Sequence, residues 1–239
     1  MKQSIILILL TAAICLIATA PIVGIEQTPR GGFDADFFGR AVFFGESTTA
    51  HLRNRSRISP KQVWANSSGT AKLDSTLTER PLVDPEGGAP ITLPQLAARE
   101  TPPWMVLSFG LNGIMTFSRD REFYLTQYQK LMQTLSLASP ETQFLIQSVY
   151  PVAREALQKD WKFSEPPHEI NRRISLLNGW LSEMCQETEK AVFVDTSFVL
   201  KDSEGYLRDD FTTDGIHLNE QAYEAILGRL SDCKSLMID

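Results

Sequence analysis

Apolar segments with the composition of strands alternate with amphipathic helical segments along most of this chain. The pattern predicts strands at 40–45, 62–65, 104–109, 143–150 and 191–195. It predicts helices at 48–57, 92–100, 120–137 and 168–187, and a closing helix that Asn219 caps and that ends near Cys233. Such alternation is typical of an α/β domain in which helices cover both faces of a mostly parallel sheet. Residues 61–91 contain several Pro and Gly, and they predict short strands and loops that shape part of a cleft.

The first predicted strand leads directly into Gly45-Glu46-Ser47. A serine at the end of a parallel strand stands at the edge of the sheet where functional groups collect, and a turn there can expose its hydroxyl as a nucleophile. Serine is also a common helix N-cap, which explains the same position without any chemistry. The interpretation of Ser47 as a nucleophile therefore depends on finding a base.

The chain has three histidines, and only His217 has a carboxylate placed to orient it. Asp214 stands three residues before His217, on a predicted loop just ahead of the closing helix. His51 lies on the helix that follows Ser47, and His168 opens a helix in polar surroundings. Considered singly, Asp214 predicts only a turn, and His217 predicts only a polar residue near the start of a helix. Together with Ser47, they supply the nucleophile, base and orienting acid for acyl transfer.

An asparagine follows the predicted strand at 104–109, in the sequence Gly110-Leu111-Asn112-Gly113. An Asn side chain at the carboxyl end of a strand can donate its amide to a developing oxyanion. Asn-Gly is equally a strong turn sequence, so Asn112 alone predicts only a turn. Its occurrence beside the Ser47 and His217 elements favours the oxyanion role.

These blocks resemble those of the SGNH/GDSL hydrolase family, which carries Gly-Asp-Ser, a Gly, Gly-x-Asn-Asp and Asp-x-x-His in that order. The last block matches fully, at 214–217, and the resemblance covers roughly residues 38 to 232. Glu46 replaces the usual Asp of the first block, and Gly113 replaces the second acidic residue of the third. These departures leave the serine, the histidine and the asparagine in place, so they concern substrate preference more than chemistry.

The resemblance implies a three-layer α/β/α fold with a flavodoxin-like, mostly parallel sheet. It also implies catalytic Ser47, Asp214 and His217, and an oxyanion hole formed by the Ser47 N–H, a glycine N–H and the Asn112 side chain. We assign the glycine to Gly69, which follows the predicted strand at 62–65. No metal or organic cofactor is implied for such a hydrolase.

Several other functions are disfavoured by composition and motifs. The net charge of −6 and the lack of a basic cluster with interleaved aromatic residues argue against binding to nucleic acid. No Gly-rich phosphate loop, HExxH or CxxC occurs in the sequence. His168-Glu169 begins like a zinc helix, but Arg172 stands where the second His would be. The Gly-x-Ser-x-Gly motif of α/β-hydrolases is also absent.

The N-terminal segment predicts a location outside the cytoplasm. Ile5 to Ile25 carries no charge and follows Lys2, and it is long enough to span a bilayer. Ala18-Thr19-Ala20 resembles a signal-peptide cleavage site, but Pro21 follows it directly. We therefore expect a signal anchor at 1–25, with a cleaved signal peptide and secretion as the alternative. A linker at 26–38 and a hydrolase domain at 39–239 follow.

Cys15 lies in the uncharged N-terminal segment, and the other two cysteines, Cys185 and Cys233, fall on predicted helices. They could pair in an oxidising compartment or remain separate thiols, and the sequence leaves both possibilities open. It gives no indication of the oligomeric state.

The leading prediction is an extracytoplasmic serine esterase that removes short, acetyl-type acyl groups. The resemblance suggests a small acyl ester or an acylated glycan as its substrate. An O-acyltransferase that uses the same site to modify a glycan is one alternative, and a catalytically silent glycan-binding module is another. The presence of all four polar side chains argues against the silent module.

Overall fold

The structure is a computed structural model that describes residues 33–155 and 163–233. Within these residues five strands form one parallel sheet in the order β2-β1-β5-β6-β7. The strands are β1 (Ala41–Gly45), β2 (Val63–Trp64), β5 (Trp104–Ser108), β6 (Gln143–Gln147) and β7 (Ala191–Val194). When the five strands are numbered in chain order, this is the flavodoxin-like order 2-1-3-4-5. Successive strands are added on one side of β1 and then on the other, so the strand order reverses between β1 and β5. The predicted three-layer α/β/α fold is confirmed.

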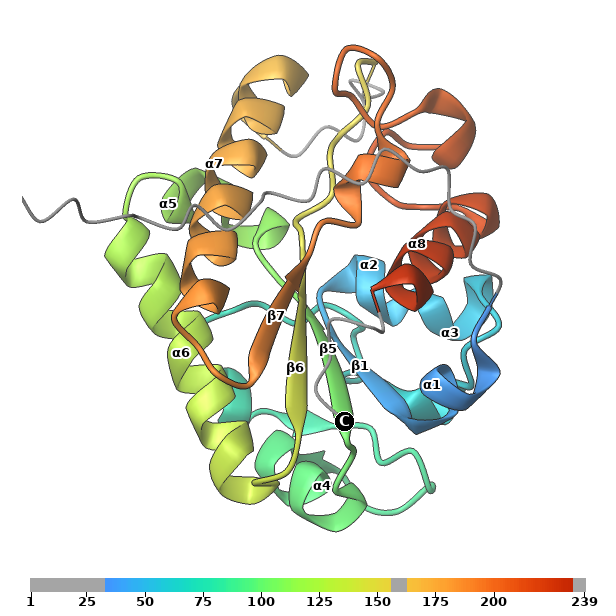
Figure 1. Ribbon diagram of the computed structural model, residues 1–239, viewed down its shortest axis with the longest axis vertical. Coiled ribbons are helices and arrows are strands. Elements are labelled where there is room, and N and C mark those ends of the chain that lie inside the picture. Colours follow the sequence, from blue (N-terminus) through green and yellow to red (C-terminus); the bar gives the residue numbers. More distant parts are fainter. Residues whose placement is uncertain (1–32, 156–162, 234–239) are drawn as a thin grey trace, which may run out of the picture.

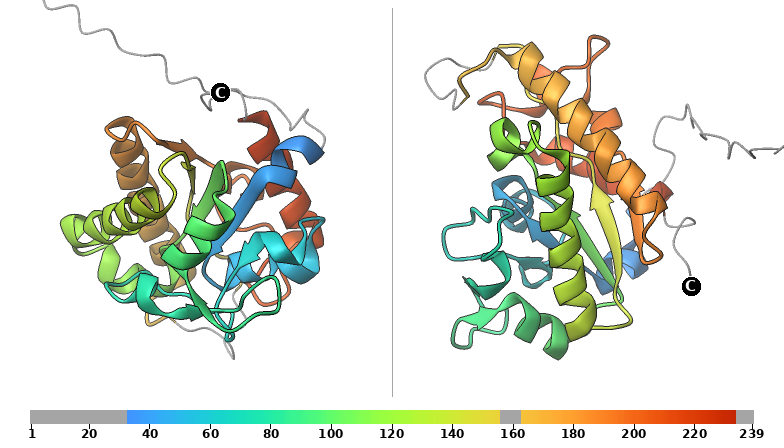
Figure 2. Two further views of the ribbon diagram at one scale, coloured as in Figure 1. Left: turned by 90° about the horizontal axis from the view of Figure 1, so that it is seen from below. Right: turned by 90° about the vertical axis from the view of Figure 1, so that its left-hand side faces the viewer.

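Helices lie on both sides of the sheet (Figure 1), and one hydrophobic core fills the space on each face. Successive strand residues point to opposite faces, so Phe44 joins the core under α6 while its neighbour Phe43 joins the core under α8. The first core is covered by α4 (Leu93–Glu100), α6 (Arg121–Ala138) and α7 (Pro167–Gln186). The second is covered by α1 (Ala35–Arg40), α3 (Leu52–Arg55) and α8 (Glu220–Asp232). Figure 2 shows the two groups of helices on either side of the strands.

The helices and strands predicted from sequence agree with the structure except at three places. The helix expected at 48–57 is divided into α2 (Ser47–Ala50) and α3, with His51 between them. The last strand residues expected before 150 leave the sheet, since β6 ends at Gln147. The linker expected through residue 38 ends earlier, because α1 is capped by Asp34 and its Phe37 and Phe38 are buried.

The segment 61–91 contains short elements, as predicted. It includes β2 and the antiparallel pair β3 (Pro81–Leu82) and β4 (Ile91–Thr92). The remaining short elements of the described residues are α5 (Ile114–Phe117) and the 3₁₀ helices η1 (Pro60–Gln62), η2 (Leu77–Glu79), η3 (Leu111–Gly113), η4 (Ser197–Leu200) and η5 (Asp209–Phe211). Asn219 caps α8 as expected, because its side chain accepts the Ala222 N–H.

Cys185 and Cys233 are both free and buried, and they belong to different cores on opposite faces of the sheet. A bond between them would have to pass through the strands, so the possibility of pairing is excluded in this fold. The predicted anchor at Ile5 to Ile25 lies outside the described residues. No helix of 33–155 and 163–233 is long and apolar enough to cross a membrane.

Candidate active site

Ser47 is the first residue of α2, directly beyond the carboxyl end of β1. The N-cap of α2 is Glu46, so Ser47 is not the helix cap that the alternative hypothesis expected. Gly45 is required for the turn, since a Cβ there would lie 2.2 Å from Thr49 Oγ1 and 2.5 Å from the Ser108 carbonyl oxygen. The serine hydroxyl is consequently held at the sheet edge on a tightly packed turn.

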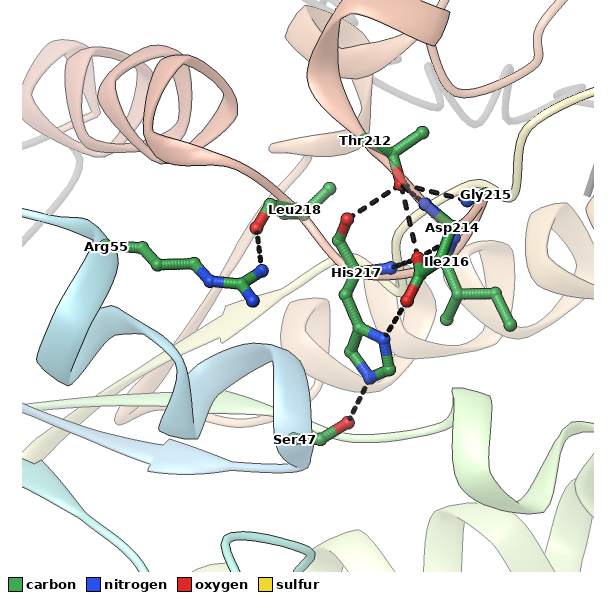
Figure 3. A network of polar contacts seen from close by, with 8 residues as sticks. All are labelled: Ser47, Arg55, Thr212, Asp214, Gly215, Ile216, His217 and Leu218. Atoms are coloured by element: carbon green, nitrogen blue, oxygen red, sulfur yellow. Dashed lines mark hydrogen bonds and ion pairs between the residues drawn. The ribbon is translucent and has the colours of Figure 1, made fainter. Parts of the chain in front are cut away.

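The loop that carries Asp214 and His217 is fixed by its own hydrogen bonds (Figure 3). One carboxylate oxygen of Asp214, Oδ1, accepts the backbone N–H groups of Ile216 at 2.9 Å and His217 at 2.7 Å. The Thr212 hydroxyl donates to the His217 carbonyl oxygen at 2.7 Å and accepts the Gly215 N–H at 3.0 Å. Gly215 has a φ of 84°, a left-handed conformation that glycine adopts readily. The loop thus presents both side chains in one orientation.

The structure brings the three predicted side chains into one hydrogen-bonded row. The Ser47 Oγ lies 3.2 Å from His217 Nε2, and His217 Nδ1 lies 2.6 Å from Asp214 Oδ2. An ionised carboxylate can only accept, so Nδ1 carries the ring proton and Nε2 is left as an acceptor for the serine hydroxyl. The row joins residues 170 positions apart in the sequence.

Asp214 is arranged to remain ionised. Its partial burial raises the pKa, but the hydrogen bonds from the His217 ring and from the backbone N–H groups of His217 and Ile216 outweigh burial and hold the pKa near 2. These bonds favour the charged form because they are made to the carboxylate. Asp214 therefore provides a fixed negative charge behind the imidazole.

Asn112 lies in η3, beyond the carboxyl end of β5, and its side chain is exposed. Strands β1 and β5 are neighbours, with Gly45 opposite Ser108, so the turns that carry Ser47 and Asn112 lie on either side of the point where the strand order reverses. Ligands of open α/β sheets bind at such a point. The Asn112 amide donates to the Ala71 carbonyl oxygen at 3.3 Å, which orients it on the 66–73 loop.

Gly69 lies on that same loop with a φ of 66°, close to Ala50 of α2. Its N–H donates to the Asn66 carbonyl oxygen at 3.1 Å, which closes a turn. The N–H that we expect to join an oxyanion hole is thus engaged within its own loop. By contrast, the first N–H groups of a helix have no partner inside that helix, so the N–H of Ser47 stands where such a donor is needed.

Glu46 has a buried carboxyl group, and in sequence it differs from the usual first block only in replacing Asp. It accepts the Gly110 N–H at 2.9 Å and the Asn112 N–H at 3.1 Å. Burial raises its pKa to about 7, although the N–H groups of residues 110–112 act in the opposite direction. Its position between Gly45 and Ser47 is the one feature of the sequence that indicates a role for Glu46 at the site.

His51 is the second side chain that sequence reasoning did not assign. Its ring centroid lies 4.9 Å from that of His217, at an interplanar angle of 49°. His168 is exposed on α7 and belongs to a different part of the molecule. No group of three or more His, Cys, Asp or Glu side chains in the described part of the chain is placed to hold a metal ion.

Solved structures share this fold at low identity. A protein from Streptococcus pneumonia that is named as a platelet activating factor aligns with a TM-score of 0.55 and 19% identity, over 81% of this chain and 82% of that chain. A family two carbohydrate esterase from Clostridium thermocellum, an active-site mutant, aligns with a TM-score of 0.50 and 16% identity, over 82% of this chain and 63% of that chain. At these identities the likeness shows the fold.

One curated relative matches in sequence. The N-acylneuraminate cytidylyltransferase of Escherichia coli is 27% identical over 129 residues, which is 54% of this chain but only 27% of that protein. This chain therefore spans about a quarter of the relative's length, and the name of the whole protein cannot be carried over from so small a part.

The family model for the GDSL-like lipases and acylhydrolases matches residues 43–225. The matched range begins within β1 and ends within α8, so it includes Ser47, Asn112 and the 214–217 loop. The resemblance seen in the sequence blocks is confirmed over most of the chain. The protein belongs to the GDSL-like lipase/acylhydrolase family and is a serine esterase of that family.

Proposed function

We propose that this protein hydrolyses short acyl esters outside the cytoplasm, with Ser47 as nucleophile, His217 as general base and Asp214 as the residue that orients the histidine. The observation that carries the proposal is the row of two hydrogen bonds, 3.2 Å from Ser47 to His217 and 2.6 Å from His217 to Asp214. This geometry is the one that proton transfer from a serine to a histidine requires.

The reaction has two halves. His217 Nε2 takes the Ser47 hydroxyl proton while Oγ bonds to the ester carbonyl carbon, whose oxygen becomes an oxyanion. Collapse of this intermediate breaks the bond to the alcohol, which leaves with the proton from His217. Water then attacks the carbonyl carbon of the acyl-enzyme while His217 takes a proton from it. Collapse of this second intermediate breaks the bond to Oγ, which takes the proton back from His217 as the acid leaves.

The developing oxyanion needs donors at the carboxyl ends of β1 and β5. The Ser47 N–H at the start of α2 and the Asn112 amide are the proposed donors, since both lie at this edge of the sheet. Gly69 remains a third candidate, on condition that its N–H leaves the Asn66 carbonyl oxygen when substrate binds. Removal of one such donor typically costs about 10²–10³ in kcat.

The substrate class is proposed as an acetyl-type ester, with acylated carbohydrate as the favoured alcohol. Support comes from the acylhydrolase family and from the shared fold with a carbohydrate esterase. The extracytoplasmic location is proposed from the uncharged segment Ile5 to Ile25 alone.

The test is turnover of p-nitrophenyl acetate by the purified full chain and by Ser47→Ala. We expect the variant to lose activity by several orders of magnitude while it keeps the fold, because triad residues act as a unit. Ser175→Ala is the matched control, since Ser175 is exposed on α7, a helix that carries none of the proposed site residues. Equal turnover by Ser47→Ala and the wild type would refute the nucleophile. Acylated product on an added acceptor sugar would instead indicate a transferase.

A further inference from the structure

Three polar side chains lie along α2 and α3 at four-residue intervals, namely Ser47, His51 and Arg55. His51 has helical backbone angles, φ −69° and ψ −16°, so the two short helices continue one another and these side chains share a face. Each of the three meets the segment 217–218. Ser47 contacts His217 Nε2, and Arg55 Nη1 donates to the Leu218 carbonyl oxygen at 2.6 Å (Figure 3). The His51 ring lies against the His217 ring, with 4.9 Å between their centroids.

The backbone of His217 is held from both sides. The Thr212 hydroxyl donates to its carbonyl oxygen, Thr212 and Leu218 form an antiparallel bridge, and Arg55 holds the next carbonyl group. These backbone contacts do not by themselves restrain rotation of the imidazole about its side-chain bonds. Asp214 limits this rotation at Nδ1, and Ser47 limits it at Nε2.

The contact with Ser47 cannot persist through the proposed reaction. Once Oγ carries the acyl group, it has no proton to donate to Nε2. Nε2 must then accept a hydrogen bond from the attacking water while the ring stays in place. This step rests on the proposed function. A single hydrogen bond to Asp214 leaves the ring able to swing about Nδ1, so a further contact on the ring face is needed at that stage.

His51 supplies a ring at that place, and its surroundings indicate packing rather than charge. Its Nδ1 is buried and has no hydrogen-bond partner in residues 33–155 and 163–233. Burial lowers the pKa of His51, as do the charges of Arg55 and His217, while Asp214 acts in the opposite direction. These influences together disfavour a positive charge on His51, so they act against two charged rings facing each other.

We propose that His51 is a positioning residue for this esterase, whose ring packs against His217 and keeps Nε2 directed at the reaction centre after Ser47 has been acylated. The role needs a flat ring of the right size, and it needs neither nitrogen. Loss of the His51 ring should slow the reaction of the acyl-enzyme more than it weakens the binding of substrate. This difference distinguishes a positioning residue from a residue that only packs in the core.

Two variants of the full chain test this role. His51→Ala removes the ring, and we expect kcat to fall about tenfold or more and KM to fall with it, because slower deacylation lets the acyl-enzyme accumulate while the binding of substrate is unchanged. His51→Phe keeps a flat ring without nitrogen atoms, and we expect it to retain at least about a third of the wild-type kcat. The exposed His168→Ala is the control for loss of a histidine as such.

A pre-steady-state measurement assigns the effect to the right step. With p-nitrophenyl acetate, release of nitrophenol reports acylation and the steady rate reports deacylation. We expect His51→Ala to slow deacylation more than acylation, so that the nitrophenol burst grows. Circular dichroism and thermal unfolding of each variant verify that the domain is folded.

The possible results separate this inference from the proposed function. Wild-type kcat in His51→Ala overturns the positioning role, and so does a loss in His51→Phe as large as that in His51→Ala, since the ring would then not be the working part. Both results leave Ser47 as the nucleophile. Undiminished turnover by Ser47→Ala overturns the proposed function itself, whatever the His51 variants do.

Discussion

The carboxyl group of Glu46 accepts the backbone N–H of Gly110 at 2.9 Å, and this contact joins the turn after β1 to the turn after β5. The Glu46 backbone completes the link, since its N–H donates to the Ser108 carbonyl oxygen at 3.2 Å. Gly110 has a φ of 147°, and a Cβ there would lie 2.6 Å from Val149, so the approach needs glycine. The residue before the proposed nucleophile thus fixes the loop that carries Asn112.

Glu46→Gln should change how stability depends on pH. Burial raises the pKa of Glu46 from 4.5 to about 7, so the folded state favours the protonated form. The contribution is complete below pH 4.5 and is lost as pH rises through 7, and it amounts to about 3 kcal/mol in the free energy of unfolding. Urea unfolding at pH 4.5 and pH 8 should show this loss for the wild type and not for Glu46→Gln.

The control for that measurement is Glu141→Gln, because Glu141 is exposed ahead of β6. It should follow the wild type at both pH values. An identical pH dependence in Glu46→Gln would mean that folding does not raise the pKa of Glu46, because the N–H groups of residues 110–112 offset burial.

Asp214→Asn should lower kcat by roughly 10³–10⁴ with the fold preserved, because an amide cannot hold the imidazole in the tautomer that leaves Nε2 free to accept. The hydrogen bonds that keep the pKa of Asp214 near 2 also stabilise the folded state above pH 3.8, and this stabilisation is lost as pH falls towards 2. Kinetics of the variant should be compared with Asp209→Asn, which changes an exposed acid nearby. If Asp214→Asn and Asp209→Asn both lowered kcat only slightly and equally, Asp214 would stabilise the loop and would not orient the catalytic histidine.

The sequence predicted those features that depend on local pattern. The period of apolar residues predicted the strands and the long helices, because β1 and β5 are buried on both faces and α6 is buried on one. The short blocks singled out Ser47, Asp214 and His217 by residue type and by their places after a strand and before a helix. The contact between Ser47 and His217 spans 170 positions and comes from the fold.

The remaining features depend on contacts between distant segments. Glu46 meets Gly110 across 64 positions of sequence, and no periodicity records such a contact. The choice of Gly69 relied on its following a strand, whereas the use of its N–H depends on the Asn66 carbonyl oxygen. Cys185 and Cys233 looked alike in sequence, and only the assignment of α7 and α8 to opposite faces separates them.

The N-terminal segment leads to a prediction about location. Ile5 to Ile25 is uncharged and Pro21 disfavours cleavage after Ala20, so we expect the chain to stay anchored with its catalytic domain outside the cytoplasm. Fractionation of expressing cells and mass spectrometry of the N-terminus measure this. A soluble product that begins near residue 21 would refute the anchor and support secretion, and a full-length cytosolic protein would refute both.

Asn112→Ala should distinguish an oxyanion donor from a turn residue. Its amide lies at the sheet edge beside the Ser47 turn, and the loop that carries it is held by Glu46 through the backbone, so removal of the side chain should leave the loop in place. We expect kcat to fall by about 10²–10³ with KM nearly unchanged, because a donor to the oxyanion binds the transition state more strongly than the substrate.

Asn54→Ala is the matched control for this substitution, since Asn54 is exposed on α3 and should tolerate it. The contact from the Asn112 amide to the Ala71 carbonyl oxygen is 3.3 Å long, near the limit for a hydrogen bond, so the amide can turn towards a substrate at little cost. A raised KM with an unchanged kcat would show that Asn112 binds the ground state. In that case the oxyanion would depend on the N–H of Ser47 and on release of the Gly69 N–H from its turn.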